Sequence, residues 1–428
     1  MAFVDIEKYP RVKAAVIFPE VVGEYTALSS EARLEEISGL ALAINLDVVF
    51  REIIKIRTVK PSTFIGQGAL DKILPLVEQG VELLVIDTRL SPIQQRNLEK
   101  KLGLKVIDRT ALILEIFGER AQTKEGKLQV ELAHLTYQRS RLVRSWTHLE
   151  RQRGGAGFLG GPGETQIELD RRIIDDKIIR IKKDLEKVRL TRSIQRSSRL
   201  KVPYPIVALV GYTNAGKSTL FNRLSDSNVF AKDLLFATLD TSMRKITLPS
   251  GRDVILSDTV GFISDLPHEL VMAFRATLEE VLNADLVVHV RDIAGENSRE
   301  QKQDVLKVLE SLGFQNIEED RRYIEVLNKI DILDMERKHD LSLNKKTYMA
   351  PLSAISGEGC ADFLQLIDDK LSADYDVIEL EVGASNGKLI AWIYDNTEVL
   401  TNVIKEDRIR FKIKLDVATN SKLQKMLA

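Results

Sequence analysis

The residues best suited to chemistry lie between 211 and 219. An apolar run, "PIVALV", leads into Gly211, and Gly216, Lys217 and Ser218 follow with the spacing G-x-x-x-x-G-K-S. In this pattern the glycines let backbone N–H groups surround phosphates, the lysine reaches the β- and γ-phosphates, and the serine hydroxyl ligates Mg²⁺. We therefore expect a nucleotide site with Mg²⁺ as cofactor, Lys217 as a catalytic residue and Ser218 as a metal ligand. The other loop residues expected to contact the nucleotide are Tyr212, Thr213, Asn214, Ala215 and Thr219.

Two further motifs follow apolar runs later in the chain. Asp258-x-x-Gly261 ends "VILSDTVGF", where the carboxylate can hold Mg²⁺ through water and the catalytic Gly261 N–H can meet the γ-phosphate. Asn328-Lys329-x-Asp331 ends "YIEVLNKID". A carboxylate at Asp331 can accept both N–H donors of a guanine edge, whereas adenine presents a mismatched pattern. The sequence therefore predicts GTP as the nucleotide, with Thr259, Val260 and Ile330 also in contact.

Two loops complete the predicted site. "YMAPLSAISG" supplies Ser353 and Ala354, whose backbone can contact the guanine oxygen, with Ile355 beside them. "FATLD" offers Thr238 as the Mg²⁺-sensing threonine of a switch loop, so Thr238 is both a predicted metal ligand and a predicted catalytic residue. The other switch-loop residues expected to contact the nucleotide are Phe236, Ala237, Leu239 and Asp240.

Each motif also has an ordinary structural alternative. Asp331 could cap a helix, Thr238 could be a plain loop residue, and Asp258 could form a turn. The motifs nevertheless occur in order, mostly just after apolar strands, as expected where an open α/β sheet places its ligand loops. The pattern favours a GTP-binding domain, and Asn328 to Asp331 argue against the rival class, a P-loop ATPase or nucleotide kinase.

The elements that must position these residues predict an α/β fold in four segments. Residues 1–123 alternate apolar runs such as "AAVIF" and "ELLVID" with helical stretches, which indicates an N-terminal α/β domain. Within it, Ser91 can cap a helix and Pro92 can open the first turn. The other predicted segments are a helical hairpin at 124–200, a P-loop GTPase domain with an open, mostly parallel sheet at 201–373, and a small C-terminal α/β domain at 374–428.

Residues 124–200 carry two heptad-spaced apolar stripes on either side of the glycine-rich segment "GGAGFLGGPG". Gly155, Gly157 and Gly160 match the G-x-G-x-x-G dinucleotide fingerprint. However, the charged, helical stretch "SWTHLERQR" precedes them, where that fingerprint requires a buried strand. We therefore expect an antiparallel helical hairpin with the glycines at its tip.

Charge and composition narrow the class of protein. Residues 137–201 contain 17 Lys and Arg against 8 Asp and Glu, a local net charge of +9 in a chain whose total is −1. This asymmetry indicates either a polyanionic partner or a solvated helical surface, and charge alone leaves both open. The single cysteine, Cys360, excludes internal disulfides. No apolar run predicts a membrane span and no signal peptide is recognisable, so we expect a cytoplasmic monomer, with loose membrane association left open.

The motif order resembles that of translation-factor-related GTPases, and "GGPGETQIELDRR" resembles the HflX family of ribosome-associated GTPases. The agreement extends over nearly the whole chain through "TFIGQG", "SPIQQRNLE", "VIDRTALILEIF" and "FATLD". The resemblance implies the large (50S) ribosomal subunit and its RNA as partners, and a hairpin loop that approaches that RNA. We expect a GTPase that binds this subunit in ribosome splitting, rescue or biogenesis. The alternative is a GTPase switch that serves another RNA or protein complex.

Two residues bear on turnover. Phe262 stands where Ras-like enzymes have a glutamine that orients the attacking water, so hydrolysis should be slow alone and stimulated by ribosomes. The ring could equally well pack beneath a switch, and the two interpretations are compatible. Asn214 resembles the asparagine of GTPases that hold K⁺ beside the phosphates, which makes K⁺ a second candidate ion. The alternative for Asn214 is a polar residue that faces solvent.

Overall fold

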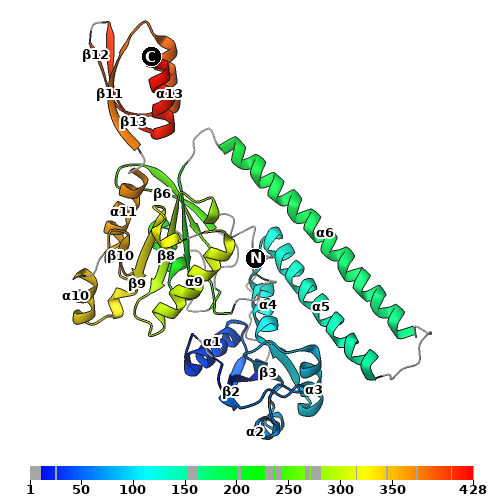
Figure 1. Ribbon diagram of the computed structural model, residues 1–428. Coiled ribbons are helices and arrows are strands. Elements are labelled where there is room, and N and C mark those ends of the chain that lie inside the picture. Colours follow the sequence, from blue (N-terminus) through cyan, green and yellow to red (C-terminus); the bar gives the residue numbers. More distant parts are fainter. Residues whose placement is uncertain are drawn as a thin grey trace, which may run out of the picture.

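The computed structural model contains three β-sheets that follow one another along the chain, with two long helices between the first and the second (Figure 1). This arrangement confirms the predicted α/β class, with a first α/β part, a helical hairpin, a second and mostly parallel sheet, and a small C-terminal α/β part. The residues that the structure describes are 11–24, 27–152, 162–199, 204–226, 235–236, 242–265, 270, 281–314, 316–343, 346–372, 375–405 and 407–427.

The first sheet is parallel, with the strand order β2-β1-β3-β4. Its strands are β1 (Lys13–Val21), β2 (Asp47–Ile56), β3 (Leu83–Ile86) and β4 (Lys105–Asp108), and its helices are α1 (Ser30–Ala43), α2 (Gln67–Glu78), α3 (Pro92–Leu102) and α4 (Arg109–Arg120). Helix α3 begins as predicted, because Ser91 and Gln94 form a capping box and Pro92 occupies the first turn. Strand order reverses between β1 and β3, which brings the loops that follow these two strands to one edge.

Helices α5 (Lys124–Gln152) and α6 (Pro162–Arg199) form the predicted hairpin (Figure 1). They pack through Leu135, Ile178 and Ile181, and Arg139, which interrupts the apolar stripe, pairs with Asp175 across the hairpin at 3.0 Å. Of the predicted glycine tip at 154–163, residues 154–161 lie outside the described residues, whereas Pro162 and Gly163 begin α6.

The second sheet has the order β10-β9-β8-β5-β7-β6, and only β6 is antiparallel to its neighbour. Its strands are β5 (Ile206–Gly211), β6 (Ser242–Thr247), β7 (Asp253–Asp258), β8 (Leu286–Asp292), β9 (Tyr323–Asn328) and β10 (Met349–Pro351). The associated helices are α7 (Lys217–Ser225), α9 (Ser298–Leu312), α10 (Met335–Leu343) and α11 (Cys360–Ser372), with short 3₁₀ turns η2 (Ile317–Glu319) and η3 (Ile330–Ile332). The phosphate loop and three other predicted loops follow β5, β7, β9 and β10, so they meet at the carboxyl edge of this sheet.

The third sheet is antiparallel, with the order β11-β13-β12. It comprises β11 (Tyr375–Gly383), β12 (Glu398–Lys405) and β13 (Arg408–Asp416), covered by α12 (Gly387–Asn396) and α13 (Val417–Leu427). A separate core around Ile393, Phe411 and Leu423 holds it together. Among the described residues, no helix has the length and apolar character that crossing a membrane requires.

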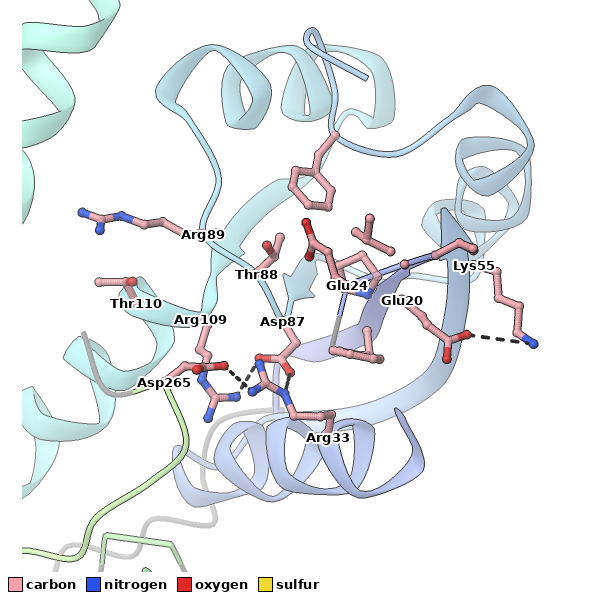
Figure 2. A pocket seen from close by; sticks show the side chains of 16 residues that line it. Glu20, Glu24, Arg33, Lys55, Asp87, Thr88, Arg89, Arg109, Thr110 and Asp265 are labelled. Carbon is pink, nitrogen blue, oxygen red and sulfur yellow. Dashed lines mark hydrogen bonds and ion pairs between the residues drawn. The ribbon is translucent and has the colours of Figure 1, made fainter. Parts of the chain in front are cut away.

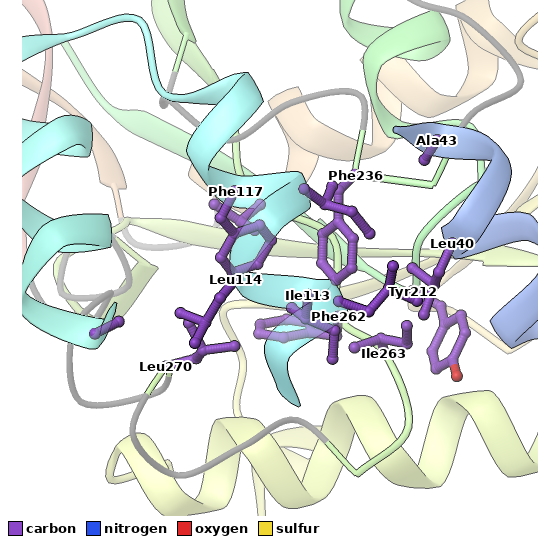
Figure 3. Close-up of a cluster of buried hydrophobic side chains, with 14 of the residues drawn as sticks. Leu40, Ala43, Ile113, Leu114, Phe117, Tyr212, Phe236, Phe262, Ile263 and Leu270 are labelled. Carbon is purple, nitrogen blue, oxygen red and sulfur yellow. The ribbon is translucent and has the colours of Figure 1, made fainter. Parts of the chain in front are cut away.

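One apolar cluster spans the first and second sheets' domains. Helix α4 contributes Ile113 and Phe117, which pack against Phe262 and Phe236 of the nucleotide-binding side (Figure 3). The rings of Phe117 and Phe236 meet edge to face, with centroids 4.7 Å apart, a geometry that stabilises aromatic pairs beyond their buried area. The N-terminal domain therefore packs directly on the segments expected to change with the nucleotide.

Candidate functional site

The phosphate loop occupies the turn between β5 and α7, and its backbone needs glycine at two places. Gly216, at the N-terminus of α7, has φ of 93°, and a Cβ there would overlap the side-chain nitrogen of Asn328. A Cβ at Gly211 would overlap the carbonyl oxygen of Val290. With glycine at these two places the loop can turn tightly, and its backbone N–H groups lie at the N-terminus of α7. Such N–H groups at a helix N-terminus are the usual structure of an anion site.

Lys217 is buried at the start of α7 and points back into this loop. Its ammonium donates to the carbonyl oxygens of Gly211 at 3.1 Å and Tyr212 at 2.7 Å. Burial lowers the pKa of Lys217 to about 8, and the charge of Asp258 offsets part of that effect. Contact with an anionic phosphate would stabilise the charged ammonium and raise the pKa of Lys217 toward its ordinary value.

Ser218, a predicted metal ligand, pairs with Asp258, the carboxylate predicted to hold Mg²⁺ through water. The Ser218 hydroxyl donates to the Asp258 carboxylate at 2.7 Å, and Asp258 is fully buried at the end of β7. Hydroxyl and carboxylate oxygens are the ligands that Mg²⁺ uses together with substrate phosphates, so these residues fit that ion. Thr238, the third predicted metal residue, lies outside the described residues, as do Ala237, Leu239 and Asp240.

Asn328 ties the phosphate loop to the predicted guanine loop. Its side-chain amide donates to the Ala215 carbonyl at 2.8 Å and accepts from the Ala354 N–H at 2.9 Å, and the residue is 1% exposed. Next to it, Lys329 has φ of 69° and pairs with Asp292 at 2.6 Å. Asp331 is exposed in η3, where its carboxylate can receive a ligand.

The remaining predicted residues of the guanine and phosphate loops differ in how far they are exposed to solvent. Ser353 and Ala354 are buried, whereas Ile355 is exposed. Asn214 is also exposed, with φ of 58°, and lines a groove that it shares with Thr213 and Asp292. The other predicted contacts Thr219, Thr259, Val260 and Ile330 lie on or beside the motifs, at the start of α7, after β7 and in η3.

Arg223 is a residue that sequence reasoning missed. It lies in α7, and its guanidinium donates to the carbonyl oxygens of Ala354, at 2.6 Å, and Ile355. Gly357, with φ of 90°, lies close against the same guanidinium. The helix that begins with the phosphate-binding residues therefore also holds the loop expected to bind guanine. No spacing rule marks such a residue, because α7 presents several polar side chains.

Gly261 and Phe262 lie against the phosphate loop. Thr213 N–H donates to the Phe262 carbonyl at 2.7 Å, and Phe262 N–H donates to the Gly211 carbonyl at 3.0 Å. A Cβ at Gly261 would come within 2.8 Å of the Thr213 methyl and 3.2 Å of the Lys217 nitrogen. The Phe262 ring is 2% exposed within the apolar cluster, so the packing role foreseen for it is present.

Two predicted nucleotide contacts turn their side chains elsewhere. Tyr212 donates its hydroxyl to Glu36 of α1 and accepts from the Ser264 N–H at 2.7 Å. Burial and the neighbouring Glu36 charge raise the pKa of Tyr212, so it stays a neutral phenol. Phe236 packs on Phe117, as described above. The contacts of Tyr212 and Phe236 with the nucleotide stay a prediction, and their backbone atoms would have to make them.

A buried cluster of charges from the N-terminal domain reaches the same segment. Arg109 pairs with Asp87 at 2.7 Å and Glu36 at 2.6 Å, and Arg33 pairs with Asp87 at 3.0 Å and with Asp265 (Figure 2). Arg33, Asp87 and Arg109 line a cavity of about 740 Å³ outside the carboxyl ends of β1 and β3. Sequence reasoning missed these residues as well, since only the fold brings them together.

Comparisons with known proteins agree along the chain. Family models match residues 31–118 as "GTP-binding GTPase N-terminal", 120–199 as "GTP-binding GTPase Middle Region", 206–329 as "50S ribosome-binding GTPase" and 340–428 as "HflX C-terminal domain".

Relatives that match over most of the chain agree with those family models. GTPase HflX of Magnetococcus marinus is 42% identical over 98% of this chain and 96% of its own, and GTPase HflX of Escherichia coli is 45% identical over 81% of each. A GTP-binding protein from Sulfolobus solfataricus, solved in complex with GDP, is 23% identical with a TM-score of 0.45, over 84% of this chain and 99% of that one.

Proposed function

Since the chain belongs to the HflX family of GTPases, we propose that it hydrolyses GTP at the carboxyl edge of the second sheet while bound to the large (50S) ribosomal subunit. The observation that carries this proposal is the bridge made by Asn328 between the phosphate loop and the loop of Ala354. A base and its phosphates could then be held by one connected frame. The same proposal gives the protein a cytoplasmic place, beside ribosomes.

Each polar residue of the site has a defined task in this scheme. Lys217 would release the two loop carbonyls and extend its ammonium to the β- and γ-phosphates of GTP. Ser218 and Asp258 would hold Mg²⁺, which when bound neutralises charge on the phosphate oxygens. Asp331 would accept the two guanine donors. Gly261, already against the phosphate loop, would offer its N–H to the γ-phosphate.

The burial of Phe262 supports a partner outside the chain. Phe262 is buried and apolar, so its side chain cannot orient a water molecule for attack on the γ-phosphate. We infer that a group from outside the chain completes the site, and such completion raises turnover by about 10³ to 10⁵ in well-known GTPases. The exposed Arg171 and Arg172 on α6 add a basic surface next to the predicted hairpin tip, as an RNA partner requires.

GTP and ATP turnover, with and without purified 50S subunits, tests the proposal. We expect slow GTP turnover alone, strong stimulation by 50S subunits, and no ATP turnover. Lys217→Ala should abolish the stimulated rate, whereas Lys245→Ala, which removes an exposed lysine on β6 paired with Asp253, should not. Stimulation by another RNA or protein complex but not by 50S subunits would replace the ribosome with that partner. Preferential ATP turnover would overturn the proposal.

A further inference from the structure

Ser264, three residues after Gly261, is gripped through all of its polar atoms. Its N–H donates to the Tyr212 hydroxyl at 2.7 Å, and its hydroxyl donates to Glu36 at 2.6 Å. The guanidinium of Arg109 donates to the Ser264 carbonyl at 2.9 Å and to its hydroxyl oxygen at 3.0 Å. Ser264 is 4% exposed, so water does not compete for these contacts.

Apart from Tyr212, the side chains that hold Ser264 come from the N-terminal domain, and they pair with one another. We call Arg33, Glu36, Asp87 and Arg109 the switch clamp. Asp87 is buried between the two arginines, and it binds Arg33 at 3.0 Å and Arg109 at 2.7 Å (Figure 2). If one of these side chains moved away, a buried charge would lose its partner, which is costly. We therefore expect the four side chains to keep this arrangement. Asp265, which follows Ser264, is bound to Arg33 as well.

The segment from Gly261 to Asp265 thus has two anchors. Backbone hydrogen bonds of Phe262 hold one end on the phosphate loop, and the switch clamp holds the other end through Ser264. Gly261 directly precedes the first anchor, and a Cβ built on it would lie 3.2 Å from the Lys217 nitrogen, so there is little space between the two residues where a γ-phosphate would enter. In the proposed function Lys217 extends its ammonium toward the phosphates, and we expect the Gly261 segment to shift as well, so that its N–H faces the γ-phosphate. A shift of the segment pulls Ser264 against the clamp.

We propose that Arg109 is a positioning residue that holds the Gly261 segment against the phosphate loop and thereby lowers the affinity for GTP relative to GDP. The proposal rests on the proposed function, because it assigns a regulator to that same nucleotide site. GDP lacks the γ-phosphate and does not require the shift, so its binding is independent of the clamp. Through Arg109, the position of the N-terminal domain sets which nucleotide the chain favours.

The test compares the dissociation constants of GTP and GDP in the full-length protein, measured by displacement of a fluorescent GDP. In Arg109→Ala we expect the GTP affinity to rise about fivefold or more with GDP affinity unchanged, within the usual range of coupling between sites. Arg109→Lys keeps the charge beside Asp87 and Glu36 and should return part of the way to wild type. Arg120→Ala serves as the matched control, because Arg120 lies on the same helix and its guanidinium donates to the Ala43 carbonyl at 3.0 Å.

A second variant guards against loss of folding in Arg109→Ala. Ser264→Ala removes the hydroxyl contacts but leaves Arg109 paired with both carboxylates, so it should fold and shift the ratio in the same direction by less. An unchanged GTP-to-GDP ratio in folded Ser264→Ala and Arg109→Ala, or a fall in relative GTP affinity, would overturn the clamp proposal. If the wild-type protein bound neither nucleotide, the proposed function would fail first, and the two failures are therefore distinguishable.

Discussion

Replacement of Arg223 by alanine offers the sharpest test of how the base-binding loop is held. The guanidinium donates to the Ala354 carbonyl at 2.6 Å and to the Ile355 carbonyl, while Asn328 holds the Ala354 N–H from the other side. In Arg223→Ala the Ala354 and Ile355 carbonyls lose this donor, while the Asn328 contact and the hydrogen bonds of Ser353 within the loop remain. The loop must then become ordered when guanine binds, and binding energy is lost to that ordering.

The structure sets the magnitude. A hydrogen bond from a charged donor contributes about 1.5–3 kcal/mol. The contact with Ala354 is partly buried and counts fully, whereas the contact with Ile355 is exposed and is weakened by solvent. The sum is about 2–3 kcal/mol. With about 1.4 kcal/mol for each tenfold change, the Kd for GTP should rise roughly 30- to 150-fold.

The assay separates binding from chemistry. The Kd comes from fluorescent-nucleotide titration and the turnover number from saturating GTP with 50S subunits, and we expect Kd to rise while the turnover number stays within about twofold. Arg252→Ala is the matched control: Arg252 donates to the Leu371 carbonyl at 3.1 Å, away from the nucleotide loops. An unchanged Kd in folded Arg223→Ala, or a loss confined to the turnover number, would refute the reasoning.

Three further predictions concern the nucleotide and the partner. Because burial lowers the pKa of Lys217 to about 8 and phosphates restore the charged form, GTP binding should take up a proton at pH 9 and weaken as pH rises from 7 to 9. Calorimetry in two buffers of different ionisation enthalpy measures that proton, and the absence of uptake would contradict the assignment. Asp331→Asn should weaken GTP and favour xanthosine triphosphate, since a lost acceptor costs about 1–3 kcal/mol, and an unaltered GTP Kd would disprove the guanine role. Replacing residues 155–161 by a short serine-rich turn should spare GTP binding but remove most stimulation by 50S subunits, and full stimulation in that variant would exclude the glycine segment as the RNA-facing tip.

The same Lys217 pKa has an opposite consequence for stability. In the ligand-free folded chain the ammonium is disfavoured, so between pH 8 and the ordinary lysine pKa the unfolded state binds more protons than the folded state. The contribution of Lys217 to the free energy of unfolding therefore rises with pH over this window. Nucleotide affinity falls over the same window, because the bound form needs the proton.

The sequence predicts the strand, loop and helix around Gly216 well because the structure there is local. Gly216, Lys217 and Ser218 are neighbours in the chain, and a short loop between a strand and a helix fixes their geometry. The capped start of α3 is local in the same sense, since Ser91 and Gln94 satisfy each other's backbone groups within one turn. Apolar runs that alternate with helical stretches also predict the parallel sheets, because a strand buried on both faces appears in the sequence as a continuous apolar run.

The domain interface could not be read in the same way. Glu36, Arg109 and Ser264 form one cluster, yet more than 70 residues separate each from the next along the chain. A buried charge looks like a surface charge in sequence, since no periodicity distinguishes them. Tyr212 stands in a phosphate-loop position, which suggested nucleotide contact, and only the packed fold shows that its side chain points to Glu36.

The carbonyl of Gly211 shows why the two halves of the molecule must respond together. It accepts from the Lys217 ammonium at 3.1 Å and from the Phe262 N–H at 3.0 Å. When phosphates draw the ammonium away, this carbonyl keeps only the Phe262 donor, and the Phe262 segment continues within two residues to Ser264. We therefore expect a change of charge at the phosphates to be transmitted to Ser264 and Arg109 through this carbonyl and residues 262–264. These contacts are buried, so a group that loses its partner there is not readily compensated by water.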